Sequence, residues 1–560
     1  MKREVSILFD ILENRGVKDV VCSPGSRNAP LLLDVASREG FSKHIVVDER
    51  MAAFIALGIS MVSRTPSVLI CTSGSAVLNY APALAEAYYQ GVPLIVVSAD
   101  RPLEWIDQDD SQTIRQYGIL SSITKGSYDI TADRDSKDYA WYTNRLVNEA
   151  YLKAVTEKPG PVHINVRLAP PLDERVNSER NQRIVRAIEP HQKLERKTLD
   201  ELVEQAATLK TMIVAGAMKP DSRLQKAVLK LMRLPNVCIM AETISNLHLP
   251  SSEFMVDSVL ARLTDKEKES LRPELLISIG GSLVSNMLKK YLRDYSPQEH
   301  WYVGNPDNLI DCFKSLTTKI ELPAPDFMAQ FASRITTRNH YNPISSVYRE
   351  SWRKTREEAT DKNESYFNSI GWCDLTAFRA ILSTMPEDIN LFLSNGTPIR
   401  YSQIIPYKMP HATYCNRGVA GIEGSVATLI GGSLKYSRLS LLITGDMSLS
   451  YDLSSLGSPL VNGRMRVIVM RNGGGAIFRH IESTRRLQER EQYFCADSPM
   501  PLKAYALASN WEYHEASNLE ELQECISTFY DDSSAPKLLC VNLKEVDGSI
   551  NLRKFLENKI

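Results

Sequence analysis

The stretch SVLICTSGSAVLNYAPALAEAYYQGVPLIVVSAD (67–100) decides the fold class of this chain. It opens with an apolar run typical of a strand, turns through small residues, continues as a helix from near Ala76, and closes with a second apolar run. Both runs are rich in Val, Ile and Leu and lack polar alternation, which is typical of strands buried on both faces of a parallel sheet. The segment therefore predicts a strand–helix–strand unit of an α/β protein.

The same pattern recurs on both sides of this segment. Two stretches interrupt it: the charged residues 173–197, and residues 320–370, whose polar part around 349–364 predicts a helix or linker. We therefore predict three doubly wound parallel-sheet domains, 1–180, 195–340 and 370–560. The other strand-like runs are DVVCS (19–23), VHINV (162–166), TMIVAG (211–216), ELLISIG (274–280), INLFLS (389–394), LSLLITG (439–445), RVIVMRN (466–472) and KLLCVNL (537–543).

Composition excludes several classes of protein. The 560 residues include 66 Lys and Arg against 67 Asp and Glu, so the net charge is −1 and no basic block predicts nucleic-acid binding. The nine cysteines form no CxxC pair, which argues against a zinc site. No apolar run approaches the ~18–20 residues of a membrane span. The N-terminus does not resemble an export signal, so we expect no membrane association and a cytoplasmic location.

The turn after the first strand, VVCSPGSRN (20–28), is a candidate anion site. Ser23 or Ser26 can cap the helix that follows, and helix N-termini bind anions through free N–H groups. Arg27 adds a guanidinium fork for a carboxylate or phosphate. The alternative is an ordinary strand-to-helix turn with a surface arginine.

Glu49 lies where a strand gives way to a helix that is apolar almost all round, MAAFIALGISMV (51–62). With Thr72 and Arg101, it falls at the carboxyl end of a predicted strand, where α/β sheets bind their ligands. The alternative is that Glu49 only caps its helix.

A third pattern lies near the end of the chain. The run LLITG leads to Asp446, and after a spacer of 25 residues (447–471) Asn472 follows a second strand and opens a glycine run. A carboxylate, a carboxamide oxygen and a backbone carbonyl can hold Mg²⁺ together with diphosphate oxygens. The glycines let the backbone approach the phosphates. The alternative is a pair of unrelated loops.

Together these motifs resemble the thiamine-diphosphate enzymes, and within them the 2-succinyl-5-enolpyruvyl-6-hydroxy-3-cyclohexene-1-carboxylate (SEPHCHC) synthase family of menaquinone biosynthesis. The resemblance covers essentially the whole chain. It implies pyrimidine-binding, central and diphosphate-binding domains, with active sites between subunits of a homodimer or homotetramer. The motifs that carry it are SPGSR (23–27), DERMAAFIALG (48–58), TSGSAVLNYAPALAEA (72–87), SADRP (98–102), SQTIRQ (111–116), NRGVAGIEG (416–424), GDMSLSYDL (445–453) and NGGGAIF (472–478).

The resemblance also implies a reaction. With thiamine diphosphate and Mg²⁺ or Mn²⁺, 2-oxoglutarate loses CO₂ and the succinyl carbanion equivalent adds to isochorismate by conjugate addition. Glu49 would form a hydrogen bond with the pyrimidine ring of the cofactor, and Ile422 would hold the cofactor in a bent conformation. The implied metal ligands are Asp446, Asn472 and the carbonyl of Gly474, and the residues implied to line the site are Ile477 and Phe478.

Both substrates are dianions, so their pocket needs several fixed cations. The resemblance assigns Arg27, Arg101, Arg400 and Arg417 to this task, with Ser26 and Gln112 as polar contacts. For any one arginine, the alternative is a solvated surface charge.

Three positions depart from the family pattern. Some relatives have a Lys-Arg pair where this chain has Asn286-Met287, followed by Lys289 and Lys290 in a helix predicted to begin near Ser285. A family Ser before Arg400 is replaced by Gly396 or Thr397. Arg471 precedes Asn472, the implied metal ligand, at a position where relatives often have Asn. Two other functions stay open: another thiamine-diphosphate decarboxylase or carboligase, such as an acetolactate synthase relative, and a cofactor-binding protein without activity.

Overall fold

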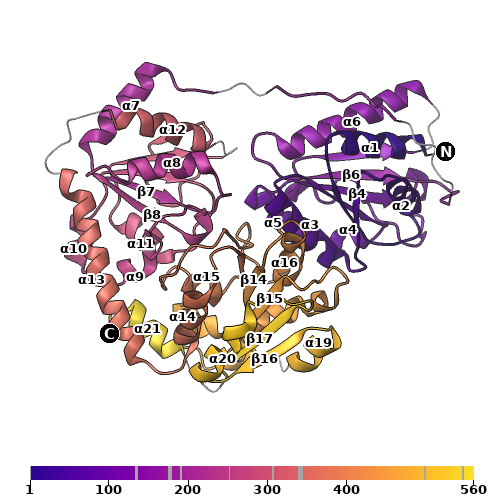
Figure 1. Cartoon of the computed structure of the whole chain (residues 1–560). Helices are drawn as coiled ribbons and strands as arrows, with labels where there is room; N and C mark the ends of the chain where they lie inside the picture. The colour runs from indigo at the N-terminus through magenta and orange to yellow at the C-terminus, as the bar shows by residue number, and fades with distance from the viewer. Residues whose placement is uncertain are drawn as a thin grey trace.

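The computed structural model contains three parallel sheets covered by helices, which confirms the predicted α/β class (Figure 1). Figure 1 shows the first sheet at the upper right, the central sheet at the upper left and the third sheet below them. The structure describes residues 2–132, 136–173, 180–188, 192–250, 253–304, 308–337, 345–496, 500–544, 546 and 548–559.

The first sheet has six parallel strands in the order β2-β1-β3-β4-β6-β5. Parallel neighbours require crossover connections, and helices supply most of them here. The strand order reverses between β1 and β3, so the ends of these two strands flank the crevice where such sheets bind ligands. The elements are α1 (Arg3–Asn14), β1 (Asp19–Cys22), α2 (Ala29–Ala36), β2 (Ser42–Ile45), α3 (Glu49–Ser63), β3 (Ser67–Cys71), α4 (Ala76–Asn79), α5 (Ala81–Gln90), β4 (Leu94–Asp100), β5 (Ser127–Thr131), α6 (Lys137–Val155) and β6 (Pro161–Arg167).

The central sheet has five parallel strands in the order β11-β10-β9-β7-β8. Its strands β7, β8 and β9 are buried along their whole length, as their continuous apolar runs predict. The elements are α7 (Arg196–Thr208), β7 (Thr211–Ala215), α8 (Ser222–Leu231), β8 (Val237–Ala241), α9 (Val256–Leu260), α10 (Asp265–Ser270), β9 (Leu275–Ile279), α11 (Asn286–Asp294), β10 (Glu299–Val303), β11 (Thr318–Ile320) and α12 (Ala324–Ile335).

One long helix, α13 (Tyr348–Ser369), connects the central and third sheets. The polar segment around 349–364 is therefore helical. Trp352 and Ala359 lie in a core of the central sheet, whereas Phe367 lies in a core of the third. Helix α13 therefore joins the central and third sheets. The boundaries of the three domains remain a prediction.

The third sheet has six parallel strands in the order β13-β12-β14-β15-β17-β16. Its order reverses between β12 and β14, which sets the ends of β12, β14 and β15 around one crevice. The elements are α14 (Asp374–Thr384), β12 (Asn390–Leu393), α15 (Thr397–Tyr401), β13 (Ala412–Tyr414), α16 (Ser425–Ser433), β14 (Ser440–Gly445), α17 (Asp446–Tyr451), β15 (Met465–Arg471), α18 (Glu482–Arg485), α19 (Leu502–Ala508), β16 (Glu512–Ala516), α20 (Leu519–Phe529), β17 (Lys537–Asn542) and α21 (Ser549–Leu556).

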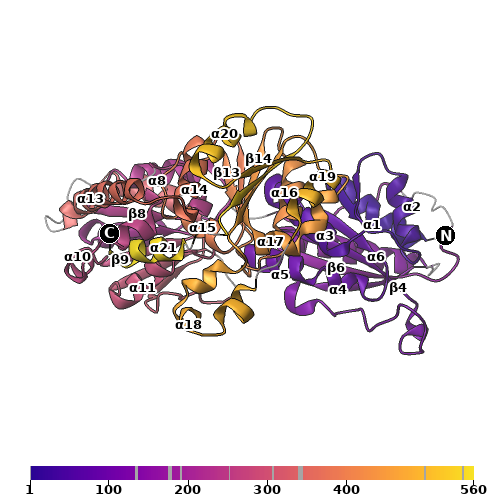
Figure 2. The same cartoon turned by 90° about the horizontal axis from the view of Figure 1, so that it is seen from below.

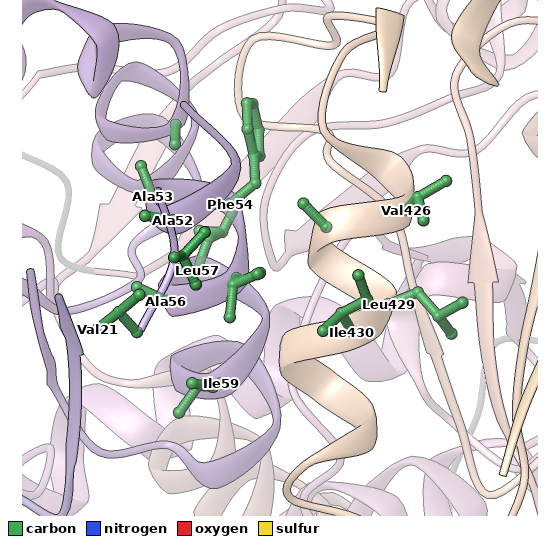
Figure 3. Close-up of a cluster of buried hydrophobic side chains, with 14 of the residues drawn as sticks. Val21, Ala52, Ala53, Phe54, Ala56, Leu57, Ile59, Val426, Leu429 and Ile430 are labelled. Atoms are coloured by element: carbon green, nitrogen blue, oxygen red, sulfur yellow. The ribbon is translucent and has the colours of Figure 1, made fainter. Parts of the chain in front are cut away.

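The first and third domains share one hydrophobic core, because α3 packs directly on α16 (Figures 2 and 3). Phe54 of α3 lies against Gly424 at the start of α16, and Gly58 of α3 lies against the backbone of Thr428. The two backbones lie so close that a Cβ atom at Gly431 would meet the carbonyl oxygen of Ile55 at 1.9 Å. This contact fixes how the strand ends of the two domains lie relative to one another.

Among the described residues, no helix combines the length and apolarity that crossing a bilayer requires.

Candidate functional site

The turn after β1 buries Arg27 rather than exposing it. Its Nη1 donates to the carbonyl of Leu168 at 3.0 Å. Burial lowers the pKa of Arg27, and the charge of Arg101 lowers it further, so the two guanidinium groups lie near each other. Ser26, in the same turn, is exposed. The predicted serine cap is wrong: α2 begins after Asn28, and no side chain caps it because Asn28 donates back to the Ser23 carbonyl at 2.8 Å.

Arg101 follows β4 and is held by the loop that comes after it. It pairs with Asp110 at 2.8 Å and donates to the carbonyl of Ser111 through Nε at 3.0 Å and Nη2 at 2.8 Å. Gln112, exposed and at φ 55°, lies with its backbone against Gly74 in the turn after β3. The loop thereby brings Arg101 and Gln112 to the same sheet edge as Arg27.

A glutamine that the sequence analysis did not single out fastens this loop. The buried Gln116 accepts from the Gly74 N–H at 3.1 Å and donates to the carbonyl of Ala99 and the Oδ1 of Asn165, both at 2.8 Å. It lies in the SQTIRQ motif, four residues after Gln112, so the motif contained the signal.

Glu49 is half-buried and is the first residue of α3. The cap is supplied by its neighbour Asp48, whose Oδ1 accepts from the N–H of Met51 at 3.1 Å. The carboxylate of Glu49 lies close enough to the buried Cys71 and Tyr80 to raise the pKa of both, although burial is the larger cause. Glu49 is therefore not needed for capping and is available to a ligand.

The edge around Glu49 contains buried hydroxyl groups that a ligand could satisfy. Among the described residues, the hydroxyls of Thr72 and Ser73 are buried and have no hydrogen-bond partner. Buried polar groups are normally paired, because desolvation without a hydrogen bond is costly. These two groups in the turn after β3 fit the polar part of a bound cofactor.

In the third domain, the two loops of the Asp446–Asn472 pattern form one structure. Asp446 opens α17 directly after β14, and its Oδ2 accepts from the N–H groups of Gly473 at 3.0 Å and Gly474 at 3.1 Å. Its Oδ1 accepts from the N–H of Met447 at 2.8 Å. The alternative of two unrelated loops is therefore wrong.

Asn472 has a partner that sequence reasoning missed. Its Nδ2 donates to Oδ2 of Asp374 at 3.1 Å, across 98 residues of chain. Because a carboxylate offers only acceptors, the amide nitrogen must face Asp374, and the amide oxygen is left for a cation. Asp374 is buried, and burial together with the charge of Asp446 raises the pKa of its carboxyl. In the sequence, Asp374 is indistinguishable from an ordinary acidic residue in a first helical turn.

The apolar candidates border this group. Ile422 is half-buried, and its carbonyl accepts from the hydroxyl of Ser448, in the helix that Asp446 opens, at 2.5 Å. Ile477 and Phe478 are half-buried in a short helical turn, Ala476–Arg479, after the glycine run, and the ring centroid of Phe478 lies 5.8 Å from that of Phe494. Side-chain oxygens and apolar side chains therefore lie close together at the strand ends of the third sheet.

Arg400 and Arg417 form a cationic pair near the central domain. Arg417 donates through Nη1 to Oδ1 of Asn395 at 2.9 Å and reaches the carbonyl of Leu283 through Nη2 at 3.4 Å. Burial lowers the pKa of Arg400, and the nearby charge of Arg417 lowers it further. The Nε atoms of both side chains are buried without a partner among the described residues. Neither arginine is an ordinary surface charge.

The neighbouring lysines of α11 differ in their surroundings. Lys289 is half-buried and donates to the same Leu283 carbonyl at 2.8 Å, beside Arg417. It also lines a cavity of about 1380 Å³ between the three domains. Lys290 is exposed and pairs with Asp294. Only Lys289 joins the cationic pair. At the positions of the missing Lys-Arg pair, Asn286 is exposed and Met287 half-buried.

The other departures from the family pattern lie beside these groups. Gly396 precedes α15 at φ 100°, and Thr397, the first residue of α15, is buried. Arg471 is half-buried and donates to the carbonyl of Met500 at 3.1 Å. This hydrogen bond gives the charged side chain next to Asn472 a partner.

The class of protein follows from the fold together with a comparison of known families. Residues 4–119 match the thiamine pyrophosphate enzyme N-terminal TPP binding domain. Three parallel-sheet domains with this match define a thiamine-diphosphate enzyme.

Full-length relatives narrow the class to one family. A 2-succinyl-5-enolpyruvyl-6-hydroxy-3-cyclohexene-1-carboxylate synthase of Porphyromonas gingivalis is 40% identical over 563 residues, covering 99% of this chain and 96% of the relative. Synthases of the same name from Flavobacterium johnsoniae and Bacteroides thetaiotaomicron are 32% and 34% identical, covering 98% and 94% of this chain and 98% and 93% of those relatives. The chain belongs to the SEPHCHC synthase family.

Proposed function

We propose that this enzyme joins 2-oxoglutarate to isochorismate, releasing CO₂ and forming SEPHCHC, as a step of menaquinone biosynthesis. The observation that carries the proposal is the set of fixed cations at the candidate site: Arg27, Arg101, Arg400, Arg417 and Lys289. Two dianionic substrates bring four negative charges, and Arg400 and Arg417, whose buried Nε–H groups have no partner among the described residues, suit them. A pocket for the monoanion pyruvate would need fewer cations, which disfavours an acetolactate synthase reaction.

The residues present fit thiamine diphosphate and a divalent cation. Asp446, the Asn472 amide oxygen and the Gly474 carbonyl would hold Mg²⁺ or Mn²⁺, since hard cations take oxygen ligands. Ile422 and Ile477 would flank the cofactor. When bound, thiamine diphosphate supplies the carbon that attacks the 2-oxo group and accepts the electron pair left by CO₂.

The protein's own residues position the reactants and move one proton. Glu49, freed from capping by Asp48, would donate or accept the proton at a ring nitrogen of the pyrimidine. The guanidinium groups would hold substrate carboxylates in place, which lowers the entropy cost of bringing two reactants together. Ser26, Gln112 and Phe478 would complete the substrate contacts.

We also propose a homodimer or homotetramer in which the first domain of one subunit and the third domain of another build each active site. Large apolar side chains next to candidate residues support this, because exposed apolar patches mark interaction surfaces. They are Val47 (77% exposed), Leu78, Val419 and Tyr451.

Product mass tests the reaction. The protein is incubated with thiamine diphosphate, Mg²⁺ and 2-oxoglutarate, with and without isochorismate, and separately with pyruvate. We expect a product with the mass of SEPHCHC only when isochorismate is present. Acetolactate from pyruvate would favour the other carboligase reaction, and no turnover of either 2-oxo acid would favour a binding protein without activity.

A further inference from the structure

A buried carboxylate of the first domain holds a loop of the third domain. Glu86, in α5, is 1% exposed, and its Oε1 and Oε2 accept from the N–H groups of Gly418 at 2.6 Å and Val419 at 2.9 Å. The N–H of Ala420 is close enough to favour the charged carboxylate as well, although burial is the larger influence and raises the pKa of Glu86. Glu86 belongs to the TSGSAVLNYAPALAEA motif, yet the proposed reaction gives it no task.

The loop that Glu86 binds, residues 416–421, lies against the backbone of α5. A Cβ atom at Gly418 would meet the carbonyl oxygen of Glu86 at 2.4 Å, so no larger residue fits there. Gln90, one turn further along α5, donates to the carbonyl of Cys415 at 3.2 Å. Helix α5 therefore contacts the loop and the residue that precedes it.

The other two domains hold the ends of this loop and Arg417 itself. Asn395 of the third domain accepts from Nη1 of Arg417 at 2.9 Å, and Ser282 of the central domain donates to the Arg417 carbonyl at 2.7 Å. Asn395, after β12, donates to the carbonyls of Asn416 and Gly421, both at 2.6 Å. Between these two anchors, Glu86 binds the backbone next to Arg417. Ile422, beyond the second anchor, has its own bond from Ser448.

We propose that Glu86 is a positioning residue that fixes Arg417 for substrate binding, so that the first domain of a chain shapes the substrate pocket of its own third domain. This inference rests on the proposed function, in which Arg417 binds a substrate carboxylate. Consecutive N–H groups converge on one carboxylate, and an amide would turn an N–H₂ group toward at least one of them. Such a mismatch leaves a buried donor unpaired and releases the loop.

A double-mutant cycle tests whether Glu86 acts through Arg417. The variants are Glu86→Gln, Arg417→Met and the double variant, each assayed for the KM for both substrates and for thiamine diphosphate affinity. We expect Glu86→Gln to raise the KM for one substrate about tenfold, and Arg417→Met to raise the same KM. If Glu86 acts through Arg417, both changes remove the same contact with the substrate. Glu86→Gln should therefore raise the KM of the Arg417→Met variant by less than about twofold. Cofactor affinity should change less than about twofold, since Ile422 and Asp446 are held separately.

Two further variants separate positioning from stability. Glu253→Gln removes a carboxylate paired with Arg356 in the central domain and should lower the melting temperature without changing either KM. Gln90→Leu removes the hydrogen bond to the Cys415 carbonyl and should raise the same KM that Glu86→Gln raises. If Glu86→Gln does not fold, the KM of Gln90→Leu tests whether α5 positions the loop.

Two results would overturn the inference: KM effects of Glu86→Gln that are equal in both backgrounds, or an unchanged KM in both Glu86→Gln and Gln90→Leu. Wild-type enzyme is assayed first. A wild type that forms no SEPHCHC contradicts the proposed function, whereas an active wild type matched by both variants contradicts only the role of Glu86.

Discussion

At the scale of single residues, two neighbouring acids at the start of α3 have different tasks. Asp48 caps the helix, and Glu49 is left half-buried at the sheet edge beside Cys71 and Tyr80. The pair therefore offers a matched comparison of one structural and one proposed catalytic carboxylate.

We predict that Glu49→Gln abolishes most of the turnover and leaves the fold intact. An amide cannot exchange a proton with the pyrimidine, and losing a positioned proton-transfer group costs about 10²–10⁴-fold. Hydrogen–deuterium exchange at the thiazolium carbon of the bound cofactor reports this step. Asp48→Asn is the control: it should leave exchange unchanged. Exchange at the wild-type rate in Glu49→Gln would contradict the assignment.

A second prediction at the residue scale concerns Asp446 and the binding of the cofactor and Mg²⁺ rather than catalysis. Asp446→Ala removes the carboxylate from the proposed metal site, so the variant should lose the increase in melting temperature that thiamine diphosphate and Mg²⁺ give together. In the wild type, ligand at a hundred times its Kd stabilises the folded state by about 2.7 kcal/mol.

The control for this experiment is Asp452→Asn in the same domain. Asp452 is also buried, but it accepts from the N–H of Ala427 at 2.8 Å and the hydroxyl of Ser455 at 2.6 Å. Its substitution should lower the melting temperature and keep the ligand-induced increase. A full increase in Asp446→Ala would show that Asp446 is not a ligand.

At the scale of elements, helix α11 turns two adjacent lysines into different groups. It begins at Asn286 with Ser285 as cap, close to where the sequence predicts it. Lys289 then lies beside Arg417 at the Leu283 carbonyl, while Lys290 pairs with Asp294 in solvent.

We predict that Lys289→Met weakens the binding of at least one substrate, isochorismate or 2-oxoglutarate, and so raises its KM, whereas Lys290→Met changes neither value. Methionine keeps an apolar stem and removes the charge, so the comparison isolates electrostatics. The exposed ion pair of Lys290 should contribute little to stability, because solvent and salt screen it. Unaltered steady-state kinetics in Lys289→Met would contradict a role of Lys289 in substrate binding. The four arginines would then be the proposed cations of the substrate pocket.

The sequence predicts elements best where strands are buried on both faces. The runs 274–280 and 439–445 become β9 (Leu275–Ile279) and β14 (Ser440–Gly445), within one residue at each end. Edge strands such as β16, whose residues are mostly exposed or half-exposed, leave no apolar run to find. The strand predicted to end at Asp48 ends at Ile45 instead. For the site, polar residues at strand ends are predictable because parallel strands end at one edge.

Asp374 and Glu86 could not be found in this way. Asp374 contacts Asn472, 98 residues further along the chain, and Glu86 contacts Gly418, 332 residues further along. Such pairings are decided by how the domains and loops pack, which one sequence without its fold does not specify.

At the scale of the whole molecule, the packing of α3 on α16 fixes the first domain against the third within a chain. Within this chain, Glu49 lies near Cys71 and Tyr80 of its own domain, and Asp446 bonds the glycine loop of its own domain. Val47, two residues before Glu49, and Tyr451, the last residue of α17, are exposed, and Arg50 donates to the Tyr451 carbonyl at 2.7 Å. This arrangement is suited to a second subunit that completes each site.

We therefore predict that two inactive variants restore activity when they are allowed to exchange subunits. If each site combines Glu49 of one subunit with Asp446 of another, a mixed dimer of Glu49→Gln and Asp446→Ala has one site in which both residues are intact. Half of the dimers in an equal mixture are mixed, so activity should reach about one quarter of the wild-type value. The mixture is unfolded and refolded together, and each variant refolded alone serves as control. Sites built within one chain would always contain one of the two substitutions, and the mixture would then stay as inactive as its parts.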